Sequence, residues 1–298
     1  RDGHAAPQEL LQEWPEGGPS LAWSAKDLGT GYSTVSVVGN RVYTMASKDE
    51  NAVVICLSLD DGTTVWEMVV GGAGTSDDYN GGWGTGQRGT PTVDGNQVFV
   101  LTDVGVVAAL DRSTGDVQWT SDLVALYGGK IPTWGYSESP LVDGNRVVVT
   151  PGEANFLVGL DRTTGEKIWS TSGTTAPAQY VSVMKGTIGT KSYYVTASKP
   201  GMFAFDAETG APLFEDTATA NGVAVIPTPV IDGDLIYHTS AYGAGNTLLQ
   251  LSDSGGDVTA NWTEQTPLTA TQLGGTPTIN GDKSISFPNT TATETYTV

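Results

Sequence analysis

Residues 109–119 read ALDRSTGDVQW, and fifty positions later residues 159–169 read GLDRTTGEKIW. Looser versions of the same phrase occur at residues 57–66, 205–214 and 251–262. The glycines of successive phrases are 53, 50, 45 and 46 residues apart. Self-similarity at a period of roughly 20–50 residues is typical of repeat architectures, in which each repeat is one supersecondary unit.

A second phrase, of the type Thr-Pro-x-Val-Asp-Gly-Asn, precedes these copies and begins at Thr90, Ser139, Thr228 and Thr276. Its Asp-Gly step suits the positive-φ positions of a tight hairpin. In the second unit we expect a short strand from Pro91, then strands over 98–101, 106–110 and 117–119. Apart from residues 7–14, no window of helical length has a 3.6-residue period, so the pattern predicts an all-β chain.

Four-stranded units repeated around an axis are the blades of a β-propeller, which leaves only short, protected sheet edges. Leu21–Trp23 matches a final blade strand with no unit before it, and residues 276–298 contain three strands without a final Trp. We predict that these ends pair and close a ring of six blades. The chain is then one domain over residues 1–298, with an extension at 1–20 and repeats over 21–298.

The aromatic residue that ends each phrase recurs at one point of every unit, which indicates packing between neighbouring blades rather than ligand binding. We assign this structural role to Trp23, Trp66, Trp119, Trp169, Phe214 and Trp262, together with the turn glycines Gly62, Gly115, Gly165 and Gly210. The repeated Asp111, Asp161 and Asp206 are expected to bond the turn backbone rather than calcium.

Two long segments, 71–89 and 125–139, connect the last strand of one unit to the first strand of the next. In a propeller such loops open onto one face beside the central channel, so they are the expected place for a ligand. The candidate ligand-binding residues are Trp83, Arg88, Trp134, Tyr136 and Glu138. The alternative is that the aromatic rings cap blade edges and that the charges pair with each other.

Composition narrows the possible partners. Lys and Arg number 14 against 33 Asp and Glu, which gives a net charge of −19. Such a chain repels nucleic acid and anionic lipid surfaces. No apolar run reaches membrane-spanning length. The chain begins at Arg1 without a signal-peptide pattern, so we expect any export signal to be absent from this sequence.

The sequence offers little catalytic or metal-binding chemistry. Cys56 is the single cysteine, so neither an internal disulfide nor a CxxC zinc site can form. The only histidines are His4 and His238, which leaves few ways to build a triad or a zinc site. Residues 84–89 match G-x-G-x-x-G, but no helix is expected to follow them. We therefore predict no catalytic residues and no metal site.

The phrase at 109–119, nearly complete again at 159–169, resembles the tryptophan-docking repeat of quinoprotein-type, PQQ-like β-propellers. The resemblance spans roughly residues 20–281, and residues 134–140 are further similar to a subgroup of secreted or periplasmic bacterial PQQ-like repeat proteins. The superfamily includes quinone-dependent dehydrogenases, an outer-membrane assembly scaffold and sensor domains. Methanol-dehydrogenase-type enzymes have a vicinal cysteine pair beside the quinone, whereas Cys56 stands alone.

These features favour a non-catalytic binding or scaffold protein outside the cytoplasm, which takes a protein partner or a small molecule at its loop-bearing face and needs no cofactor. An oxidoreductase is the alternative, with pyrroloquinoline quinone and Ca²⁺, or another metal, over the channel among Trp83, Arg88, Trp134 and Glu138. A third possibility is a structural subunit of a surface assembly.

Overall fold

Each repeat unit folds into an antiparallel sheet whose strands pair in sequence order. The computed structural model describes residues 13–254, 257–266, 278–279 and 285–286, and within them five four-stranded sheets are formed. The all-β propeller class predicted from the repeats is confirmed.

The first sheet contains β1 to β4, at Ser36–Val38, Arg41–Lys48, Asn51–Ser58 and Thr64–Gly72. The second contains β5 to β8, at Thr92–Asp94, Gln97–Leu101, Val106–Asp111 and Val117–Asp122. The third contains β9 to β12, at Leu141–Asp143, Arg146–Val149, Val158–Asp161 and Lys167–Ser170. The fourth contains β13 to β16, at Met184–Ile188, Lys191–Ser198, Gly201–Asp206 and Pro212–Asp216. The fifth contains β17 to β20, at Val230–Asp232, Leu235–Ser240, Gly245–Ser254 and Asp257–Thr266.

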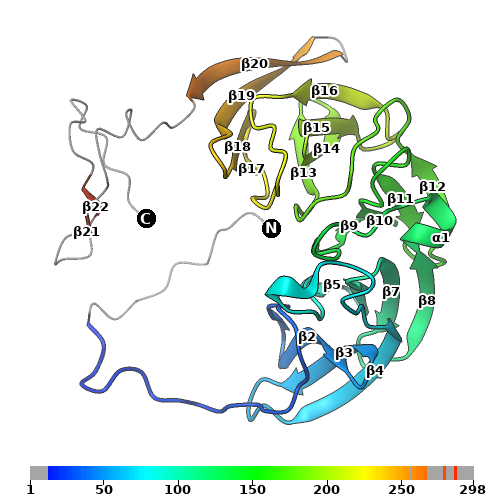
Figure 1. Cartoon of the computed structure of the whole chain (residues 1–298), viewed down its shortest axis with the longest axis vertical. Helices are drawn as coiled ribbons and strands as arrows, with labels where there is room; N and C mark the ends of the chain where they lie inside the picture. The colour runs from blue at the N-terminus through cyan, green and yellow to red at the C-terminus, as the bar shows by residue number, and fades with distance from the viewer. Residues whose placement is uncertain (1–12, 255–256, 267–277, 280–284, 287–298) are drawn as a thin grey trace.

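The five sheets fan around a common axis (Figure 1). The first strands β5, β9, β13 and β17 lie nearest that axis, and the fourth strands β8, β12, β16 and β20 lie farthest from it. The inner strands β1, β5 and β9 contact one another in order, as do β13 and β17. The connection from the outer strand of one sheet to the inner strand of the next therefore runs toward the axis.

Closure as a six-bladed ring stays a prediction. Leu21–Trp23 lies in no strand of the described part of the chain. Within the described residues, β21 (Thr278–Ile279) pairs with β22 (Ile285–Ser286) as a separate two-stranded sheet. The rest of residues 276–298 lies outside the described part of the chain.

The aspartates of the repeated phrase hold the turn between the third and fourth strands. Oδ1 of Asp111 accepts hydrogen bonds from the backbone N–H groups of Ser113 and Thr114, at 2.7 and 3.0 Å. Asp161 and Asp206 accept the equivalent pairs of bonds. The backbone donors, Thr114 first, lower the pKa of Asp111. The structural role predicted for these aspartates is confirmed.

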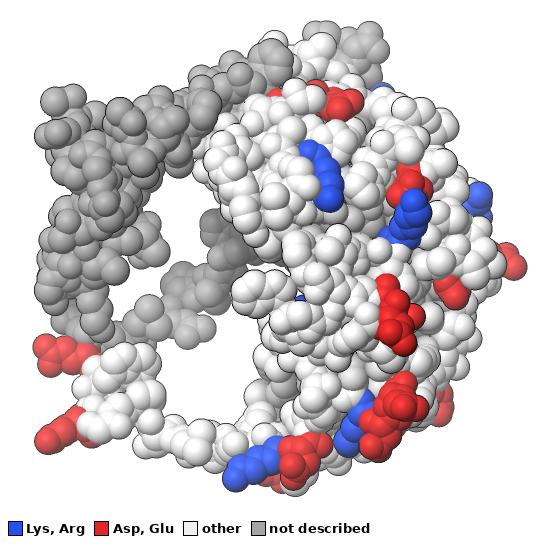
Figure 2. All heavy atoms as spheres, in the orientation of Figure 1, with Lys and Arg blue, Asp and Glu red and all other residues white. Residues whose placement is uncertain are grey.

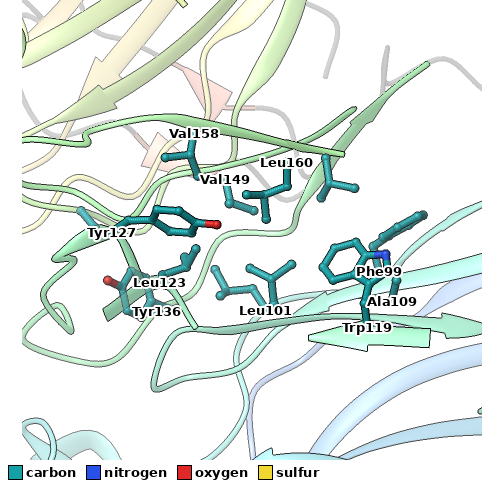
Figure 3. Packing of buried hydrophobic residues seen from close by; sticks show 13 residues of the cluster. Phe99, Leu101, Ala109, Trp119, Leu123, Tyr127, Tyr136, Val149, Val158 and Leu160 are labelled. Atoms are coloured by element: carbon teal, nitrogen blue, oxygen red, sulfur yellow. The ribbon is translucent and has the colours of Figure 1, made fainter. Parts of the chain in front are cut away.

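The repeated tryptophans contact the turn of the next sheet. Nε1 of Trp119 donates to the carbonyl of Arg162 at 2.8 Å, and Nε1 of Trp66 donates to the carbonyl of Arg112 at 3.1 Å. Each ring lies over the glycine of that turn, since a Cβ built on Gly165 would be 2.7 Å from Cδ2 of Trp119. Figure 3 shows Trp119 beside Phe99 in the core between the second and third sheets.

Ring contact with a turn glycine recurs in other pairs of the predicted set. Nε1 of Trp23 donates to the carbonyl of Leu59, and the Trp23 ring lies over Gly62. The Trp169 ring lies over Gly210, but its Nε1 has no hydrogen-bond partner among the described residues. Phe214 is half-buried against the core of the fourth and fifth sheets. The side chain of Trp262 is outside the described part of the structure.

Two short helical elements interrupt the expected all-strand pattern. Helix α1 (Leu123–Tyr127) follows β8, with Asp122 as its N-cap and Gly128 in the left-handed conformation at its end. The 3₁₀ turn η1 (Gly81–Trp83) lies in the connection between β4 and β5. Neither is long enough to produce a helical period in the sequence, which is why the prediction missed them.

Candidate functional site: an aromatic cavity

One face of the molecule carries a cavity of about 500 Å³ with mostly aromatic walls. This aromatic cavity is lined by Tyr32, Trp83, Arg88, Trp134, Ser137, Tyr180, Ala224, Ile226 and Tyr242. Its volume falls within the roughly 300–1,000 Å³ of small-molecule sites. The polar groups are few, and Arg88 is the charged side chain among these described lining residues.

The connections between sheets bring these residues together. Trp83 and Arg88 lie between β4 and β5, and Trp134 lies between α1 and β9. Tyr180 precedes β13, and Ile226 precedes β17. Because each connection returns to the inner strand of the next sheet, side chains from loops far apart in sequence converge at one end of the axis.

Arg88 is held against two tyrosine rings. Its Cζ lies 4.7 Å from the ring centroid of Tyr32 and 5.8 Å from that of Tyr79, distances typical of cation–π contacts. Its Nη2 donates to the carbonyl of Gly84 at 2.7 Å. These contacts fix the guanidinium at the cavity wall without a carboxylate partner among the described residues.

The segment before β1 and the loop before β5 are joined through the backbone. The amide N–H of Tyr32 donates to the carbonyl of Gln87 at 2.7 Å, and the Tyr32 phenol donates to the carbonyl of Trp83. The Trp83 side chain is 78% exposed, so its ring faces solvent at the cavity mouth. The wall made by Tyr32, Trp83 and Arg88 is thus one connected unit.

A buried carboxylate lies behind this wall. Asp103 is 0% exposed and accepts hydrogen bonds from the Tyr79 phenol at 2.7 Å, from Nε2 of Gln87 at 2.8 Å and from the amide of Gly74. Burial, and next the bond to Asp103, raises the pKa of Tyr79 to about 12. Asp103 therefore anchors the long loop that carries Trp83 and Arg88.

We expect Asp103→Asn to lower the free energy of unfolding by about 2 kcal/mol, because an amide presents a donor to groups that already donate. The Tyr79 pKa should fall, since its charged acceptor is gone. Denaturant titration and the ultraviolet titration of tyrosine measure the two effects. Asp122→Asn, at an exposed helix cap, is the matched control and should cost less. Equal losses for the two variants contradict the anchoring role.

The structure separates the five predicted ligand-binding residues into two groups. Trp83, Arg88 and Trp134 line the aromatic cavity. Tyr136 and Glu138 do not line it, and both are buried. The Tyr136 phenol donates to the carbonyl of Pro151 at 2.9 Å, and Oε1 of Glu138 accepts from the amide of Thr150 at 2.6 Å. Burial raises the pKa of Tyr136. These two positions fit a role in supporting the loop rather than in touching a ligand.

Four further large lining residues escaped the sequence analysis: Tyr32, Tyr180, Ile226 and Tyr242. Each lies in a segment without a distinctive motif. Tyr180 and Ile226 precede the inner strands of later units. A large side chain just before an inner strand is therefore the sequence feature that could have identified them. Tyr242 lies in the β18–β19 connection with a positive φ of 58°, for which no such signal existed.

Charge is distributed unevenly over the visible face. In Figure 2 the coloured Lys, Arg, Asp and Glu atoms lie mostly toward the outer edge, whereas the region around the axis is largely white. In the described residues no group of three or more His, Cys, Asp and Glu side chains is placed to hold a metal ion. No helix in that part of the chain is long and apolar enough to cross a membrane.

The sequence matches one protein family over most of its length. A family model described as outer membrane protein assembly factor BamB matches residues 50–193 and again residues 182–289. None of the curated proteins matches the chain.

Several solved structures share the architecture. BamB from Moraxella catarrhalis is 18% identical with a TM-score of 0.52, over 78% of this chain and 62% of its own. Quinohemoprotein alcohol dehydrogenase from Comamonas testosteroni is 16% identical with a TM-score of 0.55, over 86% of this chain and 48% of its own. The C-terminal WD40 domain of Sif2 is 12% identical with a TM-score of 0.52, over 73% and 54%. The chain thus spans less than two thirds of each of these proteins, and the likeness shows the fold.

Proposed function

We propose that this protein, which belongs to the PQQ-like repeat family described by outer membrane protein assembly factor BamB, is a non-catalytic binding or scaffold protein. It works outside the cytoplasm and holds a partner at the aromatic cavity. An assembly factor acts by contact with other proteins, and the family match supports the same kind of role here.

The composition of the aromatic cavity carries this proposal. Trp, Tyr and Arg are enriched among the residues that contribute most to protein interfaces, and Trp and Tyr bury large rigid surfaces at low entropic cost. Trp83 and Tyr242 are 78% and 66% exposed, although large aromatic side chains are usually buried. Their exposed rings lie around a recess rather than scattered over the surface, as a binding site requires.

Two observations speak against the alternative of an oxidoreductase with pyrroloquinoline quinone and Ca²⁺. Calcium takes oxygen ligands, mostly carboxylates and carbonyls, and the described lining of the aromatic cavity includes no Asp or Glu. Cys56 lies buried in β3, away from that lining, and burial raises the pKa of its thiol. The residues at the cavity therefore do not fit this cofactor pair.

Photocrosslinking tests the binding role. A benzophenone amino acid at position 83 should give one discrete crosslinked species with envelope proteins of the producing bacterium. The same group at position 168 is the control, because Ile168 is also exposed but lies on the outer strand β12. Identical products from both positions, or none from position 83, would overturn the proposal.

An absorbance titration with pyrroloquinoline quinone and Ca²⁺ tests the enzyme alternative. Saturable binding that is lost in Arg88→Ala and Trp134→Ala would favour the oxidoreductase over the scaffold. Sizing at micromolar concentration tests the role of a subunit in a surface assembly, since a monomer argues against it.

A further inference from the structure

A second recess, of about 370 Å³, opens between the third and fourth sheets. Its charged lining residues, which define what we call the charged recess, are Asp143, Arg146, Lys185, Lys191, Asp206 and Glu208. They come from the β9–β10 and β13–β14 hairpins and the β15–β16 turn. We propose that the charged recess binds a small tetrahedral dianion, of the phosphate or sulfate kind, through its three cations. It shares no residue with the aromatic cavity, so this site goes beyond the proposed function.

A change in the repeated phrase accounts for the open space. The residue after the turn aspartate is Arg162 in the third sheet and Ala207 in the fourth. The guanidinium of Arg162 crosses to the second sheet and bonds the carboxylate and the carbonyl of Asp94. Asp143 holds the equivalent position in the next hairpin, but the alanine side chain is too short to cross to it. The space between the third and fourth sheets is therefore not filled from this turn.

Three of the chain's few cations line this space. Lys and Arg number 14 against 33 Asp and Glu in the whole sequence. Each cation has a carboxylate neighbour, with N–O distances of 2.6 Å for Arg146–Glu208, 2.7 Å for Lys185–Asp143 and 3.6 Å for Lys191–Asp206. The charged lining is thus three positive and three negative side chains. Because these charges balance, hydrogen-bonding capacity decides what the recess can bind.

The aspartates of the charged recess have little capacity left for its cations. The two carboxylate oxygens of Asp143 accept from Nζ of Lys185 and from the Tyr194 phenol, each at 2.7 Å. Oδ1 of Asp206 accepts the two backbone bonds of its own turn, and Oδ2 lies 3.6 Å from Nζ of Lys191, beyond hydrogen-bond distance. Lysine and arginine side chains carry several donors and no acceptor. The recess therefore has donors to spare and needs acceptors.

Glu208 holds the place that an anion would take. Its side chain is 78% exposed, whereas the Arg146 side chain that it pairs with is 16% exposed. An ion pair with one partner in solvent contributes little to stability, so the exchange of this carboxylate for another anion costs little. Glu208 thus covers the guanidinium as a displaceable substitute for the ligand.

A tetrahedral dianion matches this set of donors. Its oxygens point in different directions and can accept from side chains of different strands, whereas the oxygens of a carboxylate lie in one plane. Charge-assisted hydrogen bonds to phosphate are also among the stronger ones. The recess has room beyond a bare ion, so the organic group of a phosphate monoester fits as well. A long polyanion is excluded, because the net charge of −19 repels it.

Phosphorus NMR titration with inorganic phosphate at constant ionic strength tests this inference. We expect saturable binding that sulfate competes away and acetate does not. Glu208→Gln should bind phosphate roughly threefold more tightly, because it removes the competing carboxylate. Arg146→Gln should bind roughly tenfold more weakly, because it removes a charge-assisted bond. Lys191→Gln, at a side chain 32% exposed, should also weaken binding and serves as a second loss variant if Arg146→Gln does not fold.

Another exposed ion pair supplies the matched controls. Lys48 and Glu67 are 2.7 Å apart on the first sheet and do not line the charged recess. Glu67→Gln changes the net charge as Glu208→Gln does, and Lys48→Gln changes it as Arg146→Gln does. Both control variants should bind phosphate as the wild type does. The comparison separates a local site from the general effect of net charge on an anion.

The inference is wrong if the wild type shows no saturable binding or if acetate competes as well as sulfate. Equal gains in Glu208→Gln and Glu67→Gln, or equal losses in Arg146→Gln and Lys48→Gln, would also overturn it. Glycerol phosphate separates the two sources of the anion: tighter binding than inorganic phosphate indicates a monoester, and equal or weaker binding indicates the free ion. Crosslinking from position 83 tests the aromatic cavity independently, so failure here leaves the proposed function intact.

Discussion

Gly165→Ala should lower the free energy of unfolding by about 3 kcal/mol, although it adds a single methyl group. Gly165 has a φ of +73°, where an L-residue costs roughly 1–2 kcal/mol. Its Cβ would also lie 2.7 Å from Cδ2 of Trp119, a buried ring whose Nε1 is bonded to the carbonyl of Arg162. The ring cannot move away without breaking that bond, so overpacking adds to the strain.

Gly173→Ala is the matched control for this variant. Gly173 has a φ of +81°, and a Cβ there would meet nothing within 4 Å. It therefore carries the backbone strain without the ring contact. Denaturant midpoints of the two variants give the contribution of the contact between sheets by difference. If both variants lose the same stability, the tryptophan does not hold neighbouring sheets together in the way described here.

Between pH 7 and pH 5 the protein should lose about 2 kcal/mol of stability through His238. This side chain is 1% exposed, with Nδ1 2.7 Å from the Thr219 hydroxyl and Nε2 3.2 Å from the carbonyl of Pro227. Burial lowers its pKa to about 4, against opposing effects of the Pro227 carbonyl and the Asp216 carboxylate. The folded protein keeps the ring neutral, whereas the unfolded chain takes up a proton near pH 6.5.

The pH dependence of stability follows from this difference between the folded and the unfolded chain. The free energy of unfolding has its full value above pH 6.5 and decreases as the pH drops toward 4. Below pH 4 the total decrease is about 3 kcal/mol. His238→Gln removes the titrating group. The difference in the free energy of unfolding between the variant and the wild type should therefore change by about 2 kcal/mol in favour of the variant from pH 7 to pH 5. Parallel curves for the two proteins would contradict the prediction. His4→Gln is the control and should keep the pH dependence of the wild type. If it instead flattens the plot of unfolding free energy against pH, the effect belongs to His4 and not to His238.

The sequence predicted part of the candidate site. Trp83 and Trp134 stood out as flat aromatic rings in two long connections and Arg88 as a charge just before an inner strand, and all three line the aromatic cavity. Tyr136 and Glu138 lie in the same connection but point into buried contacts with Pro151 and Thr150. Spacing along a loop does not determine which side chains face outward, because that depends on the packing beneath the loop.

The repeated phrases by themselves determined the architecture. An Asp-x-x-Thr-Gly turn and an Asp-Gly hairpin are local structures, since each is stabilised by hydrogen bonds within a few residues. Repeated at nearly constant spacing, they require four-stranded sheets whose only way to bury both faces is to pack against each other. The backbone bonds of Asp111 and the ring contact of Trp119 follow from that pattern.

Only the tertiary structure decided what lies at the end of the axis. Tyr32 and Tyr242 are 210 residues apart, yet they line one cavity. Their proximity depends on how the five sheets are turned relative to one another, and many weak contacts between sheets set that angle together. The contacts of Arg88 with the rings of Tyr32 and Tyr79 are of the same kind, since they depend on the three-dimensional surroundings and leave no pattern in the sequence.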